Sequence, residues 1–425
     1  MKIKLKLFSS VAALSLLLAA CGSGSGSSGE NGASKDGAIT IWANNINVPV
    51  LEKAAENYQK DHPDFKVNVI ETGGKDIIQK TTTGLQAGGK GLPDGLLQSD
   101  DDLNGKLEAF PNAFEDLSKL GYDKYKKDFP EFKINAVSKD GKIYGMPFDA
   151  GPAGVFYRTD LYKKAGVNPE EIKTWDDFIT AGEKVKKATG KAMLAFDQAD
   201  SNVYTILLNQ QAEGYFDKDN KLTVGSDASI KAMKVMKALN DKGLLLGVTG
   251  WDSWVTSIAN SDTASVVAGG WLTGTIEQQA PDTKGKWGVM PLPAFEEGGS
   301  RSSLQGGSSF VIPSTGKNVK ETYEFLKWFT TSFEAQEIAM KGGLFPSYNP
   351  VFESKLFDEE VEFFGNQKIW RFFADEMDKI PSITYTKNDP IVRDEIVKAL
   401  GEVINGANPE DIIKNTKKNI ENRLK

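Results

Sequence analysis

Three tryptophans stand where a large flat ring is available for ligand contact. Trp271 follows Gly269 and Gly270 at the end of an expected strand, next to two residues without side chains. Trp251 and Trp254 lie in the segment GWDSW, at the expected start of a helix. A flat apolar ring suits the C–H face of a pyranose, whereas most tryptophans simply pack in a core. We expect Trp271 to contact a ligand, and leave both interpretations open for the other two.

Carboxylates form the second group of candidates. Asp100, Asp101 and Asp102 follow the expected strand 92–98 in series, and Asp149 lies in a segment rich in glycine and proline. An ionised carboxylate accepts strong hydrogen bonds from neighbouring hydroxyl groups. Acids at a helix N-terminus also favour the positive end of the helix dipole. Both interpretations can hold for the three consecutive acids, because they end a strand and begin a helix.

Polar loop residues complete the candidate set. Ligands of open α/β sheets bind beyond the carboxyl ends of the strands, and the first expected strand, 38–42, is followed there by two asparagines. A Gly-rich loop before the strand 309–312 offers backbone amides and a hydroxyl, or is a turn with positive φ. The polar candidates are Asn44, Asn45, Ser201, Asn202, Gly307, Ser308 and Tyr348, the last of which either stacks or packs.

Composition excludes several classes of function. The chain has 425 residues with a net charge of −7, and an acidic surface repels nucleic acid. Its one cysteine, Cys21, and one histidine, His62, exclude an internal disulfide and zinc sites built from several such ligands. Residues 217–220 lack the glycine and glutamate of a calcium loop. We therefore expect no metal, no cofactor and no nucleic-acid partner.

The N-terminus has the pattern of a secretory signal. Three lysines precede the apolar run 7–20, which is too short for an ordinary transmembrane helix. The run ends Leu18-Ala19-Ala20-Cys21, which resembles a bacterial lipobox in which Cys21 is lipidated; an ordinary cleaved signal with a lone cysteine is the alternative. Two acyl chains would give stable anchoring. Residues 22–37 are rich in Gly and Ser and are typical of a flexible tether.

Strands and helices alternate through the rest of the chain. Strands expected at 38–42, 66–70 and 92–98 are separated by helices at 49–60 and 76–87, which predicts a mostly parallel sheet with helices on both faces. In the segment 141–166 we expect two extended runs, 142–148 and 155–157, joined by a bend, with a helix starting near Leu161. The chain is expected to cross there between two lobes.

This segment carries a family resemblance. GKIYGMPFDAGPAGVFYRTDLYKKAG at 141–166, followed by IKTWDDFITAGEKVK, resembles the bacterial extracellular sugar-binding proteins of ABC importers, which include maltose-binding protein. The resemblance implies an α/β fold of periplasmic-binding-protein type II. Each of its two lobes is a mostly parallel sheet flanked by helices, and three crossings join them. We place these hinge segments at 149–154, 291–294 and 345–348.

The resemblance also implies a division of the chain. The expected parts are a signal peptide at 1–20, a lipidated Cys21 with its tether at 21–37, lobe 1 at 38–149 plus 294–345, and lobe 2 at 150–293 plus 346–425.

Three site residues gain a role from the match. Trp271 falls at the family's sugar-stacking tryptophan. A ligand-contacting acid falls at Asp101, with Asp100 one residue away. Gln98 stands where some relatives have a tryptophan, which implies a ligand different from long maltodextrins. From the residues themselves, Asp149 is the best candidate among the acids.

The implied function is that of a lipid-anchored, extracytoplasmic carbohydrate receptor, with no enzymatic activity. It would act as a monomer, close around an oligosaccharide, and deliver it to a membrane permease. Two alternatives stay open. The same fold accommodates a polyamine, for which the run of three acids is suitable, and a secreted glycosidase needs only a pair of carboxylates.

Overall fold

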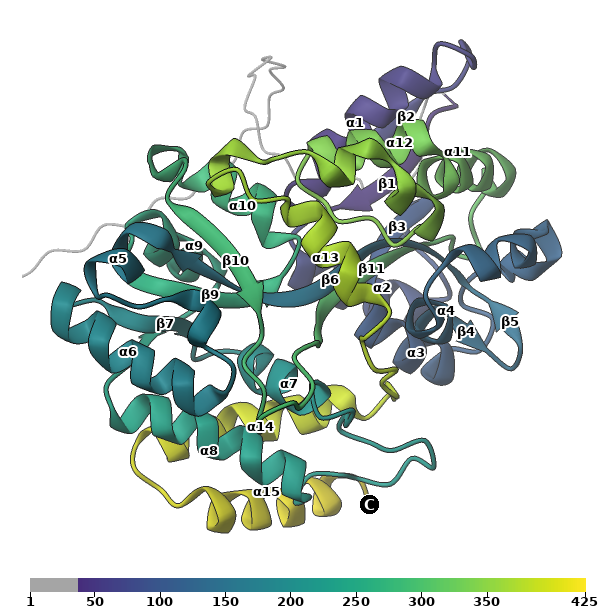
Figure 1. The fold of residues 1–425 in the computed structure, drawn as a ribbon. Coiled ribbons are helices and arrows are strands. Elements are labelled where there is room, and N and C mark those ends of the chain that lie inside the picture. The colour runs from purple at the N-terminus through teal and green to yellow at the C-terminus, as the bar shows by residue number, and fades with distance from the viewer. Residues whose placement is uncertain (1–36) are drawn as a thin grey trace, which may run out of the picture. The chain divides into compact units, whose positions relative to one another are not determined.

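The computed structural model describes residues 37–425 (Figure 1). The expected signal peptide, the lipidation site Cys21 and the tether up to residue 36 lie outside the described residues. Among residues 37–425, no helix is long and apolar enough to cross a membrane.

One half of the main sheet is built from alternating strands and helices, as the sequence predicts. The strands β1 (Ile39–Ala43), β2 (Val67–Glu71) and β3 (Gly95–Ser99) run parallel. The helices α1 (Asn47–Tyr58) and α2 (Gly74–Gln86) connect them, and α3 (Asp100–Ala109) follows. All five side chains of β1 are buried, so its apolar sequence reflects cover on both faces.

The other half has the same design. Here β7 (Ala192–Asp197) runs parallel to β8 (Leu245–Val248) and β9 (Thr263–Gly269). The helices of this half are α6 (Trp175–Thr189), α7 (Asn202–Asn209), α8 (Asp227–Asp241), α9 (Trp251–Ala259) and α10 (Leu272–Gln279). Thr174 and Asp177 form a capping box at the start of α6.

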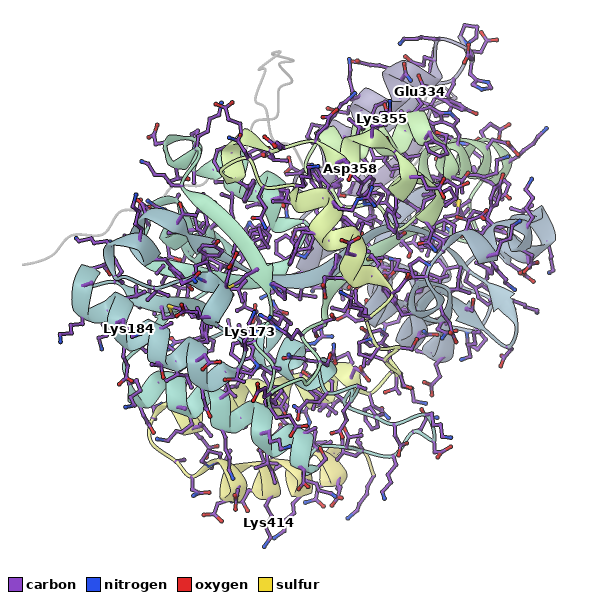
Figure 2. All side chains as sticks on the ribbon, in the orientation of Figure 1. Lys173, Lys184, Glu334, Lys355, Asp358 and Lys414 are labelled. Atoms are coloured by element: carbon purple, nitrogen blue, oxygen red, sulfur yellow. The ribbon has the colours of Figure 1, made fainter. Side chains whose placement is uncertain are left out.

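The remaining elements complete the two halves. They are α4 (Glu131–Val137), β4 (Ser138–Lys139), β5 (Lys142–Ile143), α5 (Thr159–Lys164), β10 (Trp287–Pro291), α11 (Val319–Thr331), α12 (Phe333–Lys341), α13 (Ile369–Met377), α14 (Asp389–Ile404) and α15 (Pro409–Arg423). Charged side chains such as Lys184 on α6 and Lys414 on α15 point outward from these helices (Figure 2). Trp42 on β1 is buried in the core and is 4% exposed.

A single long strand, β6 (Gly145–Arg158), joins the halves. Its first part pairs with β11 (Leu304–Val311), and its second part pairs with β9 and β10, all antiparallel. The main sheet is therefore continuous in the order β2-β1-β3-β11-β6-β9-β7-β8 (Figure 1). The predicted bend between 148 and 155 is wrong, and α5 begins at Thr159 rather than near Leu161.

The second and third crossings lie beside β6. After β10 the chain returns through 292–303 into β11. Later, Ala150 donates a backbone hydrogen bond to Phe345 and Ser347 donates one to Phe148, which places 345–347 along the same strand. Three chain segments therefore meet at the middle of the sheet.

Glycines in β6 and β9 allow another backbone segment to approach these strands closely. The sequence pattern around the β6 glycines predicted a bend instead. At β11 the register with β6 shifts between Leu304 and Gly307. The carbonyl oxygen of Gln305 at this irregularity would lie 1.9 Å from a Cβ atom at Gly151 and 2.7 Å from one at Gly269. Side chains at either glycine would collide with backbone, so the glycines serve contact between segments and not chain reversal.

We expect Gly151→Ala to destabilise the protein by about 1–3 kcal/mol, because the new methyl group overlaps the Gln305 carbonyl and the backbone must move. Gly401→Ala is the matched control. It lies inside α14 with nothing within 4 Å of a Cβ, and should stabilise the helix by about 0.5–1 kcal/mol. Urea unfolding of both variants measures the two changes. Equal stability of Gly151→Ala and wild type would contradict the close approach.

Candidate ligand-binding site

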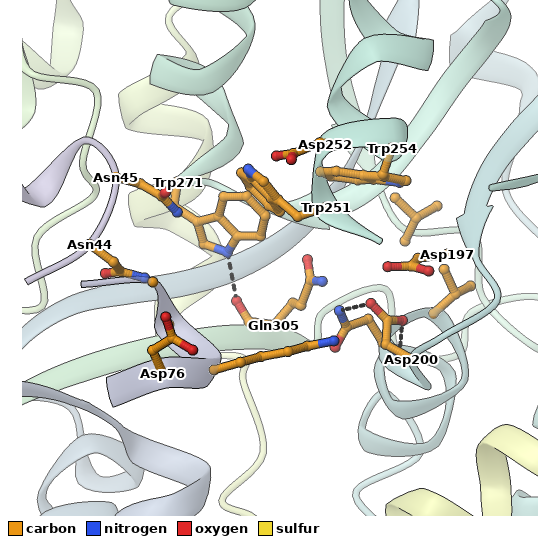
Figure 3. Close-up of a pocket in the computed structure, with 16 residues that line it drawn as sticks. Asn44, Asn45, Asp76, Asp197, Asp200, Trp251, Asp252, Trp254, Trp271 and Gln305 are labelled. Atoms are coloured by element: carbon orange, nitrogen blue, oxygen red, sulfur yellow. Dashed lines mark hydrogen bonds between the residues drawn. The ribbon is translucent and has the colours of Figure 1, made fainter. Parts of the chain in front are cut away.

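A cavity of about 590 Å³ lies beyond the carboxyl ends of β1, β7 and β9. This volume is within the range of roughly 300–1,000 Å³ that is usual for small-molecule sites. Elements from both halves of the sheet line it (Figure 3). The lining residues are Asn44, Asn45, Gly73, Gly74, Lys75, Asp76, Asp197, Asp200, Asn202, Val203, Trp251, Asp252, Trp254, Val267, Trp271 and Gln305.

Three tryptophans form one wall of the cavity. The ring centres of Trp251 and Trp254 are 5.5 Å apart, and those of Trp251 and Trp271 are 5.9 Å apart. The third distance, between Trp254 and Trp271, is 6.4 Å. Trp251 is 41% exposed, which is unusual for so large an apolar side chain. The group is a broad aromatic surface that faces polar residues across the cavity (Figure 3).

Trp271 is held in place by Gln305 on β11, the strand that follows the second crossing. Its indole N–H donates a hydrogen bond of 3.0 Å to the carbonyl oxygen of Gln305. The Gln305 side chain accepts a hydrogen bond of 2.9 Å from the backbone amide of Gly269, so the end of β9 and the start of β11 are bonded to each other. A Cβ at Gly269 would lie 2.6 Å from the indole nitrogen, and one at Gly270 would meet the Phe373 ring. Gly269 therefore makes room for the Trp271 ring, and Gly270 for that of Phe373.

Two acids follow the end of β7. Asp197 accepts hydrogen bonds from the amides of Ala199 and Gly250, each through Oδ1, and so fixes the turn that begins α9. Asp200 accepts from the amide and side chain of Asn202 at 2.9 and 2.7 Å. Burial raises the pKa of Asp200 to about 6, against the hydrogen bond from Asn202, which lowers it.

The side of the cavity opposite the tryptophans comes from the first half of the sheet. Asn44 and Asn45 follow β1, and Lys75 and Asp76 lie in the first turn of α2. The cavity thus holds Asp76, Asp197, Asp200 and Asp252 against one lysine, Lys75. Sequence analysis missed all five of these charged residues and Gln305. Asp197 is the last residue of β7 and Asp200 follows it, so both lie at the carboxyl end of a strand, as Asn44 does after β1.

Six of the predicted site residues line the cavity: Asn44, Asn45, Asn202, Trp251, Trp254 and Trp271. Asp101 and Ser201 lie at a smaller hollow of about 60 Å³ that shares Asn202 and Gln305 with the cavity. Their polar groups have partners within the protein. Asp101 forms an ion pair of 2.7 Å with Arg393, and the Ser201 hydroxyl lies 3.0 Å from that of Tyr215.

Asp149 and Asp100 do not line either hollow, contrary to the expectation for cleft acids. Both are buried beneath the crossing of β6 and β11. Asp149 Oδ1 accepts the amide of Ser308 at 2.6 Å, and Asp100 accepts the hydroxyl of Ser309 at 2.6 Å and forms an ion pair with Lys133. Burial raises the pKa of Asp149 to about 6, while Lys133 lowers it. These acids are occupied in holding the strands together.

Four other predicted residues lie in packed positions. Gln98 is fully buried and donates to Asp102 at 2.9 Å. Tyr348 is 8% exposed, and its ring centre is 5.4 Å from that of Phe129. Gly307 lies inside β11 rather than in a turn, although its φ is positive at 108°, and the amide of Ser308 donates to Asp149. None of the four lines the cavity or the smaller hollow.

Residues 37–425 contain no group of three or more His, Cys, Asp or Glu side chains arranged to hold a metal ion. The cavity offers aromatic faces, amides and carboxylates, which suits a neutral molecule with many hydroxyl groups.

Comparisons with known proteins agree with this fold. The model of the family described as bacterial extracellular solute-binding protein matches residues 53–365. A lactose-binding protein of Rhizobium radiobacter is 32% identical over 359 residues, covering 82% of this chain and 84% of its own length. An arabinooligosaccharide-binding protein of Bacillus subtilis is 33% identical over 331 residues, with 76% and 75% covered.

Solved structures show the same architecture. The galacto-N-biose-/lacto-N-biose I-binding protein of Bifidobacterium longum superimposes with a TM-score of 0.77 at 23% identity, covering 91% of this chain and 96% of that one. The GacH receptor of Streptomyces glaucescens gives 0.76 at 21% identity, with the same coverage. The two-lobe α/β fold expected from the resemblance is confirmed. With its continuous sheet, three crossings and a cavity between the halves, the chain belongs to the family of bacterial extracellular solute-binding proteins.

Proposed function

We propose that this protein binds an oligosaccharide in the cavity and delivers it to the permease of an ABC importer. The observation that carries the proposal is the wall of three tryptophans in a cavity that also presents side-chain amides and carboxylates. Sugars present apolar C–H faces and polar edges, so one surface of each kind is needed. Relatives named for lactose and for arabinooligosaccharides support this ligand class.

Closure would follow from contacts to both halves. A ligand against Trp271 and Asp200 on one half and Asn44 and Lys75 on the other stabilises the closed form by its differential affinity for it. The three crossings at 149–154, 291–294 and 345–348 are the proposed hinges. We keep the lobes as expected from the sequence, 38–149 plus 294–345 and 150–293 plus 346–425.

We also propose where in the cell the protein acts. Membership of the family supports action outside the cytoplasm. We propose that Cys21 carries the lipid anchor, that 22–37 is the tether to the membrane, and that the protein works as a monomer without catalysing a reaction. Labelling with a radioactive fatty acid tests the anchor, and Cys21→Ala should abolish incorporation.

The acidic surplus of the cavity favours a second candidate, a polyamine. Four aspartates and one lysine line the same space as the tryptophans, and amines bind both carboxylates and aromatic faces. A melting-temperature screen of the full-length chain distinguishes the two. It would compare lactose, arabinobiose, arabinotriose and maltose with spermidine. At about 100 times its dissociation constant, a ligand adds roughly 2.7 kcal/mol of stability. Stabilisation by spermidine alone would overturn the carbohydrate proposal.

Replacing Trp271 by alanine should weaken the affinity for the stabilising sugar by about 30-fold or more, the effect typical of a buried aromatic contact of at least 2 kcal/mol. Trp251→Ala should also weaken it and, at an exposed position, leave the fold intact. The control is Phe333→Ala. Phe333 is 50% exposed but lies away from the cavity, and binding should not change. Calorimetry measures all three, and unchanged affinity in both tryptophan variants would remove the aromatic wall from the site.

Asp200 gives a pH dependence. Because the folded state raises the pKa of Asp200, the ligand-free protein is more stable when this carboxyl group is protonated. This stabilisation is lost as pH rises from 4 through about 6. A carboxylate that accepts sugar hydroxyls must be charged, so affinity should fall as pH drops below about 6. In Asp200→Asn, affinity should be independent of pH across this window. The same variant should be more stable than wild type at pH 7 but not at pH 4. Identical pH profiles of binding in both proteins would exclude Asp200 from ligand contact.

A further inference from the structure

A second hollow of about 420 Å³ adjoins the cavity and shares Asn45, Trp251 and Asp252 with it. One side is formed by the start of α1 and the end of β2, and the other by α9 and α10. The outer hollow therefore touches both halves of the sheet, as the cavity does. Trp251 borders both spaces, and Figure 3 shows its ring beside Trp271 with Asp252 above it.

The polar side chains of this outer hollow are free to bind. Among residues 37–425, Glu71, Asp252, Gln278 and Gln279 have no side-chain hydrogen bond or ion pair, and all four are exposed. The smaller hollow that adjoins the cavity through Asn202 and Gln305 has the opposite character. There Asp101 is paired with Arg393, and Ser201 and Thr205 share the hydroxyl of Tyr215. The cavity thus has two extensions. The polar groups named in the narrow extension are bonded to partners within the protein, whereas those named in the larger extension have no such partners among the described residues.

Trp251 gives the outer hollow an apolar surface as well. It is one of three large apolar side chains exposed in the described part of the chain. The rings of Trp254 and Trp271 support it on one side, so it keeps its place without further contacts. An exposed ring between two polar spaces is suited to lie under a sugar unit that bridges them.

We infer that the outer hollow is a second carbohydrate subsite, so that the protein takes linear oligosaccharides longer than two units, which extend from the cavity past Trp251. The amides of Gln278 and Gln279 and the carboxylate of Asp252 are the groups that bind the hydroxyls of the added units. This inference rests on the proposed function and adds the chain length and its direction. The narrow side around Asp101 and Arg393 is the blocked end.

The test measures the affinity for sugars of increasing length in the wild type and in a variant whose outer hollow is filled by a large side chain. Thr256 is exposed on α9 and borders the outer hollow, so Thr256→Trp places a large ring in it. Ser253→Trp is the matched control, on the same helix and exposed but outside each of the three spaces. The probes are arabino-, galacto- and maltooligosaccharides of two to five units, titrated into the full-length chain by calorimetry.

In the wild type, the Kd of the series that binds should fall by at least about tenfold between two and four units. Thr256→Trp should abolish this gain and leave the two-unit Kd unchanged, while Ser253→Trp behaves as wild type. A wild-type Kd independent of length, rejection of the longer sugars, or a Thr256→Trp variant that still gains affinity with length would overturn the outer subsite alone. Absence of binding by every length of every series would instead overturn the proposed carbohydrate function.

Discussion

The carbonyl oxygen of Gln305 is the point on which the rest of the site depends. It accepts the indole N–H of Trp271 and lies against the backbone at Gly151 and Gly269. Three segments that are far apart in sequence, on β6, β9 and β11, therefore meet at one peptide group. Buried carbonyl groups need a donor, and here that donor is the ring that forms the aromatic wall. The same contact positions the ligand surface and joins the halves of the sheet.

Charged side chains are paired within the protein at this crossing, whereas some in the cavity have no partner in the described part of the chain. Below β6 and β11, the Lys133 ammonium is fully buried, pairs with Asp100 and donates to the carbonyl oxygens of Asp149 and Ser308 at 2.7 and 3.0 Å. An unpaired charge there would be costly, so each acid is committed to a strand neighbour. In the cavity, by contrast, Asp76 and Asp252 have no partner among residues 37–425. At the crossing the aspartates have partners, whereas the cavity holds both hydrogen-bonded aspartates, Asp197 and Asp200, and the two without a partner among the described residues.

This distinction explains which parts of the site were predictable. Alternation of apolar runs identified β1, β2, β3 and α1 because burial imposes a period on sequence. The position after a strand identified Asn44, Asn45 and Trp271. Asp149 and Asp100 were misread because a buried acid paired with a distant lysine has the same local sequence as one that faces a cleft. Lys133 lies 33 residues from Asp100, and no local pattern connects them.

The glycines of β6 show that local sequence is also insufficient to predict the course of the backbone. Gly151 and Gly154 indicate a bend when only neighbours in sequence are considered. The irregular step in β11 that Gly151 accommodates lies about 150 residues later and comes from Gly306 and Gly307, with φ of 75° and 108°. A strand that carries glycine at the point where another backbone crosses it can stay extended. The Gln305 carbonyl group lies against β6 at Gly151 and against β9 at Gly269, and it accepts the Trp271 indole, so a side chain at either glycine would collide with it. These glycines are therefore required by the convergence of the strands, and their function is visible only when β11 is in place beside β6.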